Sequence, residues 1–532
     1  MKKNLYIITG ITIFSTCIFN ACRSTDTDNT ITKGASSLNI NLMGTEFSNS
    51  APSPNASISR NTAAIPVTQT HSTIVTPSTV IIAELSPSSD SSGAMATISN
   101  DISSTAATPG NTLGAGVKFR VIAYRQSNGT YQAHQDYTVG QTAVPMMLDN
   151  GTAYNIVVYS YGTTNLPAIS SGEQNTINNA AVSYDNTNRD FMYQNINYTP
   201  VNINNTLNIT LRHKVAQITT IIQNNTTQFP GNNITSVTNA VITPHYSNGS
   251  FSLATGNMSG RTTSTSADIT FPTPSGTSVT AAPVFVNTDT GGMPTATFSA
   301  KVQLSGGSIQ NILAANAFKI TPENKSNLTI NLRTCRAKVS STSTKDFMCH
   351  NLGADQSADP FTPSAAIHGA KYQWGSNGSA GWYISQTNDQ NNSGSISGWN
   401  TSGSASSNWS DTSKTSLDPC PTGYRVPTKT QIDGMINNNS ISYIGSDWSY
   451  STTNYSTGIK VGNDLFLPAA GRRSNTDGAL AERGNAGRYW TSSTDPAYTY
   501  GGIALLFTNG STSYNGYGYA RTGGLSVRCI AE

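Results

Sequence analysis

Short runs of alternating or β-branched residues recur along this sequence, and each run ends at a cluster of Asn, Gly, Ser or Pro. Residues 117–124 alternate and stop at Ser127-Asn128-Gly129, and residues 155–161 stop at Gly162. Alternation with a period of two is typical of half-buried strands, and no helical period of 3.6 is sustained over several turns. Regular short strands separated by turn residues predict a mainly β protein built from β-sandwiches.

The surface implied by the composition is nearly uncharged. Only 11% of the residues are Asp, Glu, Lys or Arg, against about 25% in typical soluble proteins. The formal net charge is +3 and the basic residues form no cluster. A nucleic-acid partner is therefore excluded, because binding to phosphates needs a basic patch. Hydroxyl and amide side chains in place of charges favour an extracellular β protein.

The N-terminus has the pattern of an export signal. Lys2 and Lys3 precede an apolar run over residues 5–19. This run is shorter than the about 20 residues that span a membrane, and it fits a signal peptide. The residues before Cys22 resemble a lipobox, which implies cleavage after residue 21 and transfer of a lipid to the Cys22 thiol. The alternative is ordinary secretory cleavage after Ala21. The preferred interpretation predicts an outer-membrane lipoprotein anchored through its acylated cysteine.

Residues 22–61 are rich in Ser, Thr, Asn and Asp, and they include Pro52 and Pro54. Such a composition cannot bury a core and is typical of a tether or propeptide between a lipid and a folded domain.

Six cysteines occur in the chain. Cys17 lies in the signal peptide and Cys22 is the lipidation candidate. The remaining cysteines are Cys335, Cys349, Cys420 and Cys529. An even number confined to one region of an exported protein indicates disulfides, and the spacing alone leaves three pairings open. Zinc ligands would need closely spaced Cys pairs, so we expect no metal.

Four segments in order, residues 116–124, 151–160, 190–193 and 211–218, resemble the fimbrillin family, the subunits of type V pili. The resemblance implies two transthyretin-like β-sandwich subdomains that join near residues 196–210. We therefore expect an N-terminal sandwich over 62–200 and a second one over 201–333. It also implies strand insertion between this chain and other pilus subunits, at the cell surface in a fimbrium.

His213 lies in the fourth of these segments. It could be a site residue, but neither an acid nor a nucleophile pattern accompanies it. We expect it to be wedged between the two subdomains, with its ring nitrogens bonded to backbone groups.

The part beyond residue 333 has a different character, because it holds all six tryptophans of the chain. Residues 418–428, 487–493 and 524–530 resemble the domain named after the Fibrobacter succinogenes major paralogues. Residues 347–351 depart from its usual pattern. The resemblance covers 334–532 and implies a C-type-lectin-like α+β domain. A short helix is predicted over residues 429–436, capped by Thr428.

Within this C-terminal domain we expect the pairs Cys420–Cys529, which would tie the start of the helix to the last strand, and Cys335–Cys349. Aromatic faces on polar loops stack on sugar rings, which makes tryptophans candidate ligand-binding residues: Trp374, Trp382, Trp399 and Trp409. The alternative is that these rings fill the core of a domain poor in Leu and Ile.

Fimbrillin subunits mature when a protease cuts after an arginine and releases the first strand. Residues 36–42 alternate Leu38, Ile40 and Leu42 with asparagine, so they predict a one-faced strand. Arg60 follows in a Pro/Ser/Asn-rich segment where cleavage is easy, and it is the expected processing site. The alternative is that Arg60 is a plain surface residue.

Together these features predict a pilus tip adhesin, with a fimbrillin body that presents a lectin-like head to a glycan or protein ligand. The alternative is a lipid-anchored glycan-binding lipoprotein outside any pilus. An enzyme is not expected, because the sequence contains neither a Ser-His-Asp nor a paired-carboxylate pattern. No cofactor is expected either.

Overall fold

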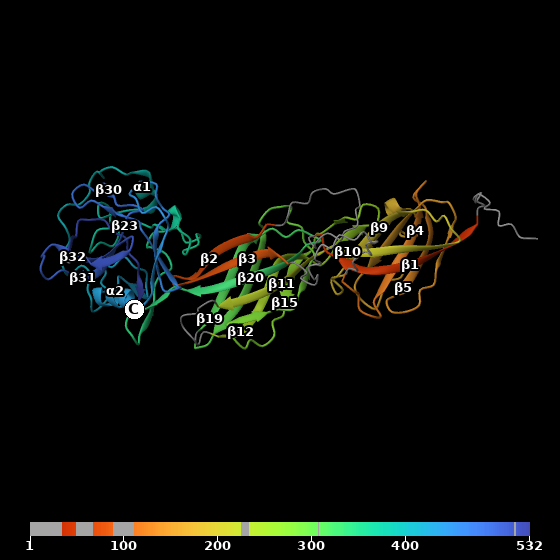
Figure 1. Ribbon diagram of the computed structural model, residues 1–532, viewed down its shortest axis with the longest axis horizontal. Coiled ribbons are helices and arrows are strands. Elements are labelled where there is room, and N and C mark those ends of the chain that lie inside the picture. Colours follow the sequence, from red (N-terminus) through yellow and green to blue (C-terminus); the bar gives the residue numbers. More distant parts are fainter. Residues whose placement is uncertain (1–33, 49–66, 89–110, 225–232, 307, 515–517) are drawn as a thin grey trace, which may run out of the picture.

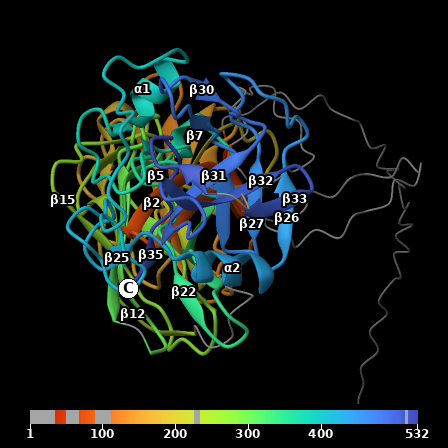
Figure 2. The ribbon, with the colours of Figure 1, turned by 90° about the vertical axis from the view of Figure 1, so that its left-hand side faces the viewer.

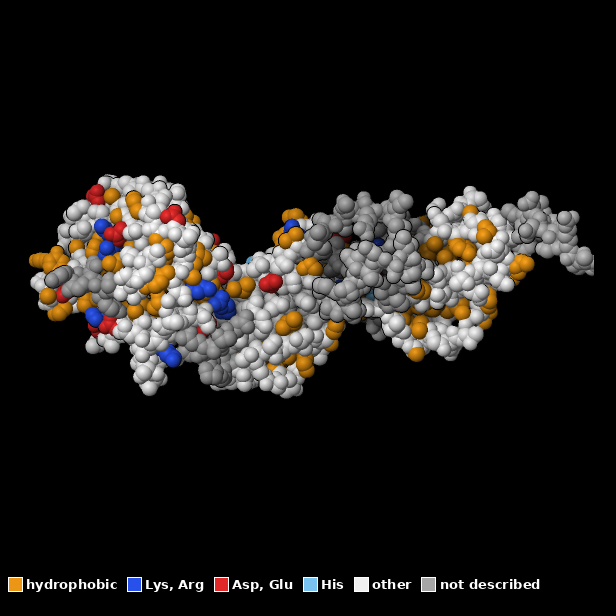
Figure 3. All heavy atoms as spheres, in the orientation of Figure 1, with side chains coloured by type: hydrophobic (Ala, Val, Ile, Leu, Met, Phe, Trp, Pro, Cys, Tyr) orange, Lys and Arg blue, Asp and Glu red, His pale blue; other side chains and the backbone are white. Residues whose placement is uncertain are grey.

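The computed structural model describes residues 34–48, 67–88, 111–224, 233–306, 308–514 and 518–532. They form three bodies in a row along the long axis of the molecule (Figure 1). Strands dominate and the helices are short, which confirms the predicted mainly β fold. In the described ranges, no helix has the length and apolarity needed to cross a membrane. Figure 3 shows few charged side chains on the visible face, as the composition predicts.

The first body is a seven-stranded sheet that curls until its edge strands approach each other. In spatial order its strands are β5 (Tyr131–Thr138), β4 (Lys118–Arg125), β7 (Tyr154–Ser160), β9 (Met192–Tyr198), β10 (Asn204–His213), β1 (Ala35–Glu46) and β6 (Met146–Asp149). Its inner face holds an aliphatic core. Its outer face is covered by η1 (Ile177–Asn179) and by a small sheet of β14 (Met258–Ser259), β13 (Ser250–Ser252) and β8 (Ala181–Ser183).

The second body is a sandwich of two sheets. One sheet has the order β16 (Ser278–Thr280), β11 (Ala216–Asn224), β20 (Lys325–Thr334), β3 (Thr79–Pro87) and β2 (Gln69–Thr76), and β17 (Val284–Val286) also pairs with β11. The facing sheet has the order β15 (Ser264–Ile269), β12 (Ile234–Tyr246), β18 (Ala296–Leu304) and β19 (Ile309–Phe318). Buried and less buried residues alternate along β11, β18 and β20, so each sheet turns one apolar face to the shared core.

The expected boundaries 62–200 and 201–333 do not match these sheets. The hairpin β2–β3 pairs with β20 in the second body, while β10 pairs with β1 in the first. The chain passes from the first sheet to the second between His213 and Ala216, beyond the expected join at 196–210. The physical reason is long-range pairing: β1 and β10 are parallel neighbours about 166 residues apart.

The third body, the head, comprises the described residues from Cys335 onward. It contains the short helices η2 (Ala365–Ile367), α1 (Gln386–Asn391) and α2 (Lys429–Asn437), and several small sheets joined by long loops. The strand pairs are β21 (Arg336–Lys338) with β22 (Thr344–Asp346), β23 (Lys371–Tyr372) with β24 (Tyr383–Ile384), β25 (Tyr424–Arg425) with β35 (Ile530–Ala531), and β29 (Arg472–Arg473) with β30 (Leu480–Ala481). The larger sheets are β26 (Ile441–Ile444), β27 (Gly458–Val461) and β28 (Leu465–Pro468), and β31 (Gly487–Thr494), β32 (Gly501–Thr508), β33 (Ser511–Tyr514) and β34 (Tyr519–Ala520). Figure 2 looks onto the head and shows β31 and β32 between α1 and α2.

The start of α2 follows the prediction from the sequence. Thr428 Oγ1 accepts a hydrogen bond from the Gln431 backbone N–H, and the Gln431 side chain accepts one from the Thr428 N–H. This reciprocal capping box satisfies two amides that the helix cannot pair itself. The helix runs one residue beyond the predicted range, to Asn437.

Two disulfides cross-link the head, Cys335–Cys349 and Cys420–Cys529. These are the two pairs expected from the sequence. Arg528, next to Cys529, is buried and donates hydrogen bonds to the carbonyls of Met348, Cys349 and Phe466. Burial lowers the pKa of Arg528 to about 10. The C-terminal Val-Arg-Cys-Ile segment therefore connects the end of the head to its beginning, through hydrogen bonds to Met348 and Cys349.

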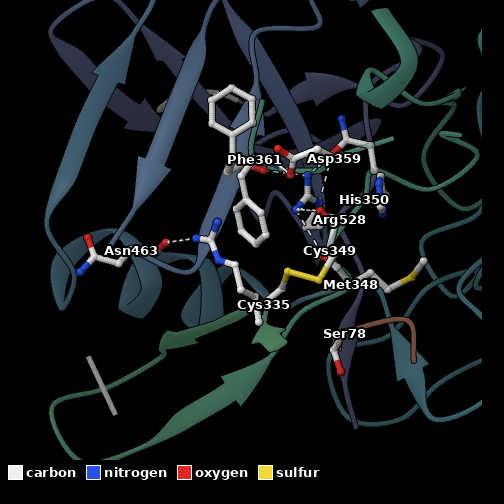
Figure 4. Close-up of a disulfide and its surroundings, with 12 residues drawn as sticks. Ser78, Cys335, Met348, Cys349, His350, Asp359, Phe361, Asn463 and Arg528 are labelled. Carbon is white, nitrogen blue, oxygen red and sulfur yellow. Dashed lines mark hydrogen bonds between the residues drawn. A yellow bond between two sulfur atoms is a disulfide. The ribbon is translucent and has the colours of Figure 1, made fainter. Parts of the chain in front are cut away.

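The head is docked on the β2–β3 hairpin of the second body. The backbone amides of Cys335 and Cys349 donate to the carbonyls of Ser78 and Pro77, each at 2.8 Å, and Figure 4 shows Ser78 beside this disulfide. Val80 of β3 is fully buried in the core of the head. Hydrogen bonds and apolar packing therefore join two bodies that the sequence presents as separate domains.

Candidate functional site

The slot occupied by β1 is the first candidate site, because β1 lies between β10 and β6 with both neighbours contributed by later parts of the chain. It runs parallel to β10 from the pair Ser37–Asn204 to the pair Glu46–Arg212. Its pairing with β6 is antiparallel and covers only residues 35–38. Removal of this one strand would therefore leave an open groove beside β10 in the first sheet.

The predicted one-faced character of β1 is confirmed. Leu38 and Ile40 are buried, with 0% and 7% of their surface exposed. On the opposite face Ser37 Oγ donates to Asn204 Oδ1 at 2.8 Å. Asn41 Nδ2 donates to Asn208 Oδ1 at 2.7 Å. The strand is held by apolar packing on one face and by a ladder of short polar side chains on the other.

The strand is longer than the predicted residues 36–42, since it continues to Glu46. A register shift between Leu42 and Gly44 allows this. Gly44 has φ of 135°, a conformation that L side chains rarely adopt. Beyond the bulge, Glu46 forms an ion pair with Arg212 at 2.7 Å.

The residue after β1, Phe47, lies on His213 at the junction between the first two bodies. Their ring centroids are 4.0 Å apart and the rings are nearly parallel, at 5°. His213 is also nearly parallel to Phe285 of β17, with centroids 5.9 Å apart. Its Nδ1 is 2.5 Å from Asp190 Oδ1. His213 therefore lies between the two bodies as expected, but its Nδ1 contacts a carboxylate, which corrects the expected backbone contact.

The strands that could be donated to a neighbouring molecule are both engaged. β20 is paired with β11 on one edge and with β3 on the other. It leads directly into Cys335 and the head. Residues 525–529 lie in the core of the head with Cys529 in a disulfide, and β35 pairs with β25.

The expectation that tryptophans of the head face a ligand is wrong for three of the four. Trp374, Trp399 and Trp409 are buried, with at most 7% of their surface exposed. Each indole N–H donates to a backbone carbonyl inside the domain. Trp374 and Trp409 pack on each other with ring centroids 5.3 Å apart. These rings fill the core, as the alternative reading held, and only Trp382 is partly exposed.

The exposed aromatic residues of the head are tyrosines. Tyr498 and Tyr500 have 43% and 68% of their surface exposed, and Tyr450 has 50%. Tyr498 and Tyr500 lie directly before β32, which is at the outer end of the head in Figure 1. Neither tyrosine was predicted as a site residue, although an Asp-Pro dipeptide followed by two tyrosines and two glycines is a pattern that favours an exposed loop.

The loop that carries these tyrosines is held by hydrogen bonds. The carboxylate of Asp495 accepts from the amides of Ala497 and Gly518. Arg521 donates from its backbone amide to the Tyr500 carbonyl at 3.1 Å and from Nε to the Gly501 carbonyl at 3.2 Å. These hydrogen bonds hold the backbone at both ends of the loop that carries the two exposed rings.

A buried charge cluster lies elsewhere in the head, around Asp389. Its carboxylate accepts from Arg473 at 2.7 Å and from Arg483 at 2.6 Å, and Lys371 Nζ is 3.7 Å away. Burial raises the pKa of Asp389, but the three cations outweigh it and hold the pKa below its usual value. Burial lowers the pKa of Lys371 to about 8. Since all four groups are inaccessible, this cluster organises loops and cannot contact a ligand.

Two predicted sites, Cys22 and Arg60, lie outside the described residues. Among the residues that are described, no group of three or more His, Cys, Asp or Glu side chains could hold a metal ion.

Comparison with known proteins gives similarity only at the level of solved structures. No family model matches the chain, and no curated protein matches it. A candidate cell adhesion protein from Bacteroides uniformis is 14% identical, with a TM-score of 0.30 over 41% of this chain and 86% of the other. A fimbrial assembly protein from Parabacteroides distasonis is 9% identical, with a TM-score of 0.27 over 43% and 86%. The fimbrial anchor protein Mfa2 from Porphyromonas gingivalis is 10% identical, with a TM-score of 0.27 over 42% and 85%. These are adhesion and fimbrial proteins, but similarities this low carry no argument about the function of this chain.

Proposed function

We propose that this chain is a cell-surface adhesin at the tip of a type V pilus. The first two bodies act as a fimbrillin subunit that accepts a strand from its neighbour. The head is a C-type-lectin-like domain that binds a glycan or protein ligand.

The observation that carries the proposal is the engagement of both candidate donor strands. A stalk subunit must offer a free alternating strand, because main-chain hydrogen bonds supply the affinity in strand addition. Here β20 is paired along both edges, and the segment before β35 is held by the disulfide of Cys529. A subunit that accepts a strand without donating either of these belongs at the distal end of a filament.

The slot of β1 supports the acceptor role. β1 is held in its sheet by backbone pairing with β10 and β6 and by side-chain contacts on both faces. The chain that leads from β1 to the other strands of the sheet passes through Arg60. Cleavage after Arg60 would leave β1 held by non-covalent contacts alone, so a competing strand could replace it.

We assign the ligand-binding face of the head to Tyr498 and Tyr500. Exposed aromatic rings on a hydrogen-bonded loop are suited to stacking on sugar rings. The surrounding residues 495–502 carry one charged side chain, Asp495, and its carboxylate accepts hydrogen bonds from two backbone amides. An uncharged ligand surface such as a neutral glycan fits this environment better than a strongly charged one.

Electron microscopy with gold-labelled antibody against the head tests the proposal. Label confined to the ends of filaments is the expected result. Label along whole shafts, or only on cell bodies away from pili, would overturn the tip position and favour a glycan-binding lipoprotein outside any pilus.

Two processing steps belong to the same proposal. Cys22 is acylated, so labelled palmitate should enter the protein and Cys22→Ser should abolish the labelling. Arg60 is the maturation site, so protein in assembled pili should begin at Asn61. A mature N-terminus at residue 22 in assembled material would contradict cleavage.

A further inference from the structure

The end of β1 is fixed to both of the first two bodies at once. Glu46 pairs with Arg212 of the first body, and the Ser48 amide donates to the Glu323 carbonyl of the second at 2.8 Å. Between them Phe47 is 4% exposed and stacks on His213. β1 therefore ends in an aromatic contact at the junction between the bodies.

The imidazole of His213 is held in the orientation in which the ring of Phe47 stacks on it. Its Nδ1 contact with Asp190 fixes the orientation of the imidazole, and Phe285 lies nearly parallel to it at 17°. Gly162 adds to this fit, because a Cβ at that position would lie 3.1 Å from Asp190 Oδ2. Two of the contributing elements, β10 and β17, belong to different bodies. The stacking surface of His213 and Phe285 therefore forms only where the two bodies meet.

We infer that the β1 slot selects its occupant by an aromatic residue that stacks on His213. The inference rests on the proposed function, in which a strand from a neighbouring pilus subunit replaces β1. β1 itself serves as the template for that strand. The required pattern is apolar residues at the positions of Leu38 and Ile40, a glycine at the bulge of Gly44, and an aromatic ring at the position of Phe47.

The aromatic ring discriminates between strands more sharply than the alternation does. Many strands alternate apolar and polar residues, and each can satisfy the pairs with β10. A ring stacked on a planar partner adds a directional contribution beyond burial of its area. Truncation of a buried Phe to Ala should lower the affinity of a strand by roughly 100-fold or more.

Peptide exchange into the full-length chain tests the inference. A protease site is placed within residues 57–60 and cut, and a fluorescent peptide of residues 34–48 is offered in excess. Fluorescence polarisation then gives the affinity of the wild-type peptide and of its Phe47→Ala and Phe47→Leu variants. The Leu variant keeps an apolar side chain and loses the plane of the ring.

We expect the Phe47→Leu peptide to bind on the order of tenfold more weakly, and the Phe47→Ala peptide on the order of 100-fold more weakly, than wild type. The Asn41→Ala peptide is the matched control and should lose only a few-fold in affinity, since it removes one exposed hydrogen bond to β10. The His213→Ala substitution in the chain should lower the affinity of the wild-type peptide and leave the affinity of the Phe47→Ala peptide unchanged. A double-mutant cycle requires this result for a direct contact.

Equal affinity of the wild-type and Phe47→Leu peptides would overturn the aromatic selection and leave the acceptor slot standing. Failure of every peptide to bind, even when the cut chain is refolded in their presence, would overturn the acceptor role and the inference together.

Discussion

The hydroxyl of Tyr424 donates a hydrogen bond of 2.8 Å to Oγ of Ser78, across 346 positions of the sequence. Tyr424 belongs to the head and Ser78 to the hairpin turn of the second body. The guanidinium of Arg333 lies 3.4 Å from the ring centroid of Phe361 and donates to the Asn463 carbonyl at 2.7 Å, across the same junction. In the adhesin proposed above, tension on the head would pass through this junction to the second body.

Tyr424→Phe should weaken the junction by about 1 kcal/mol, the usual contribution of one intramolecular hydrogen bond; this bond is partly buried. Faster hydrogen exchange of the Cys335 and Cys349 amides, which donate to the same turn, is the measurement. Tyr498→Phe is the control, because its hydroxyl lies on the far loop. Unchanged exchange in Tyr424→Phe would show that this hydrogen bond adds nothing to the backbone hydrogen bonds and the apolar packing that already join the head to the hairpin.

Loss of the longer disulfide should destabilise the head more than loss of the shorter one. Cys420 and Cys529 are 109 residues apart, and Cys335 and Cys349 are 14 apart. In the chain-entropy model these loops contribute about 4–5 and about 3 kcal/mol. Urea unfolding of the paired Cys→Ser variants, followed by tryptophan fluorescence, reports on the head selectively, since all six tryptophans lie there. The reverse order of stabilities would refute the entropic account.

The sequence predicted strands well and their partners poorly. The alternation of residues 36–42 identifies β1, because a half-buried strand must alternate. Nothing in that segment indicates its parallel pairing with β10, which depends on how the whole chain closes. The hairpin β2–β3 crosses to the second body for the same reason, and its own residues contain no signal for it.

Side-chain roles were predictable where they are local. Thr428 caps α2 through a partner three residues away, a pattern legible in the sequence. The contact of His213 with Asp190 spans 23 residues and depends on the packing of two bodies. The burial of Trp374 follows from the shortage of large aliphatic residues around it, whereas the exposure of Tyr500 follows from a loop held by Arg521.

Trp374→Ala should lower the stability of the head, whereas Tyr500→Ala should lower ligand binding and leave the stability nearly unchanged. Trp374 is fully buried and donates to the Thr491 carbonyl at 2.9 Å, so its loss should cost the head about 3–5 kcal/mol. Tyr500 contributes little packing, so its loss should change stability by less than about 0.5 kcal/mol. Binding of the purified protein to a glycan array should fall in Tyr498→Ala/Tyr500→Ala while urea unfolding stays as in wild type. An unstable Tyr500→Ala would assign that ring to the fold instead.

Acidification should lower the folding stability of the second body through protonation of His245. This imidazole is fully buried on β12; its Nδ1 accepts from the Asn287 amide at 3.0 Å and its Nε2 donates to Asn186 at 2.7 Å. Burial lowers the pKa of His245 to about 4, and the nearby charge of Arg189 acts in the same direction. A protonated ring would also turn an N–H toward the Asn287 amide, which is itself a donor.

The sign of the effect follows from the two states. In the unfolded chain His245 titrates near pH 6.5, so between about pH 6.5 and pH 4 the unfolded state binds a proton that the folded state does not. The contribution is complete above pH 6.5 and is lost as the pH falls, at about 1.4 kcal/mol per pH unit. Hydrogen exchange of β12 amides at pH 7 and pH 5, corrected for the intrinsic rate, should show this loss in wild type. His245→Gln cannot titrate and should remove most of that pH dependence, even if it lowers stability at both pH values. An unchanged slope in His245→Gln would assign the acid sensitivity to other groups whose pKa is also lowered by burial, such as His71.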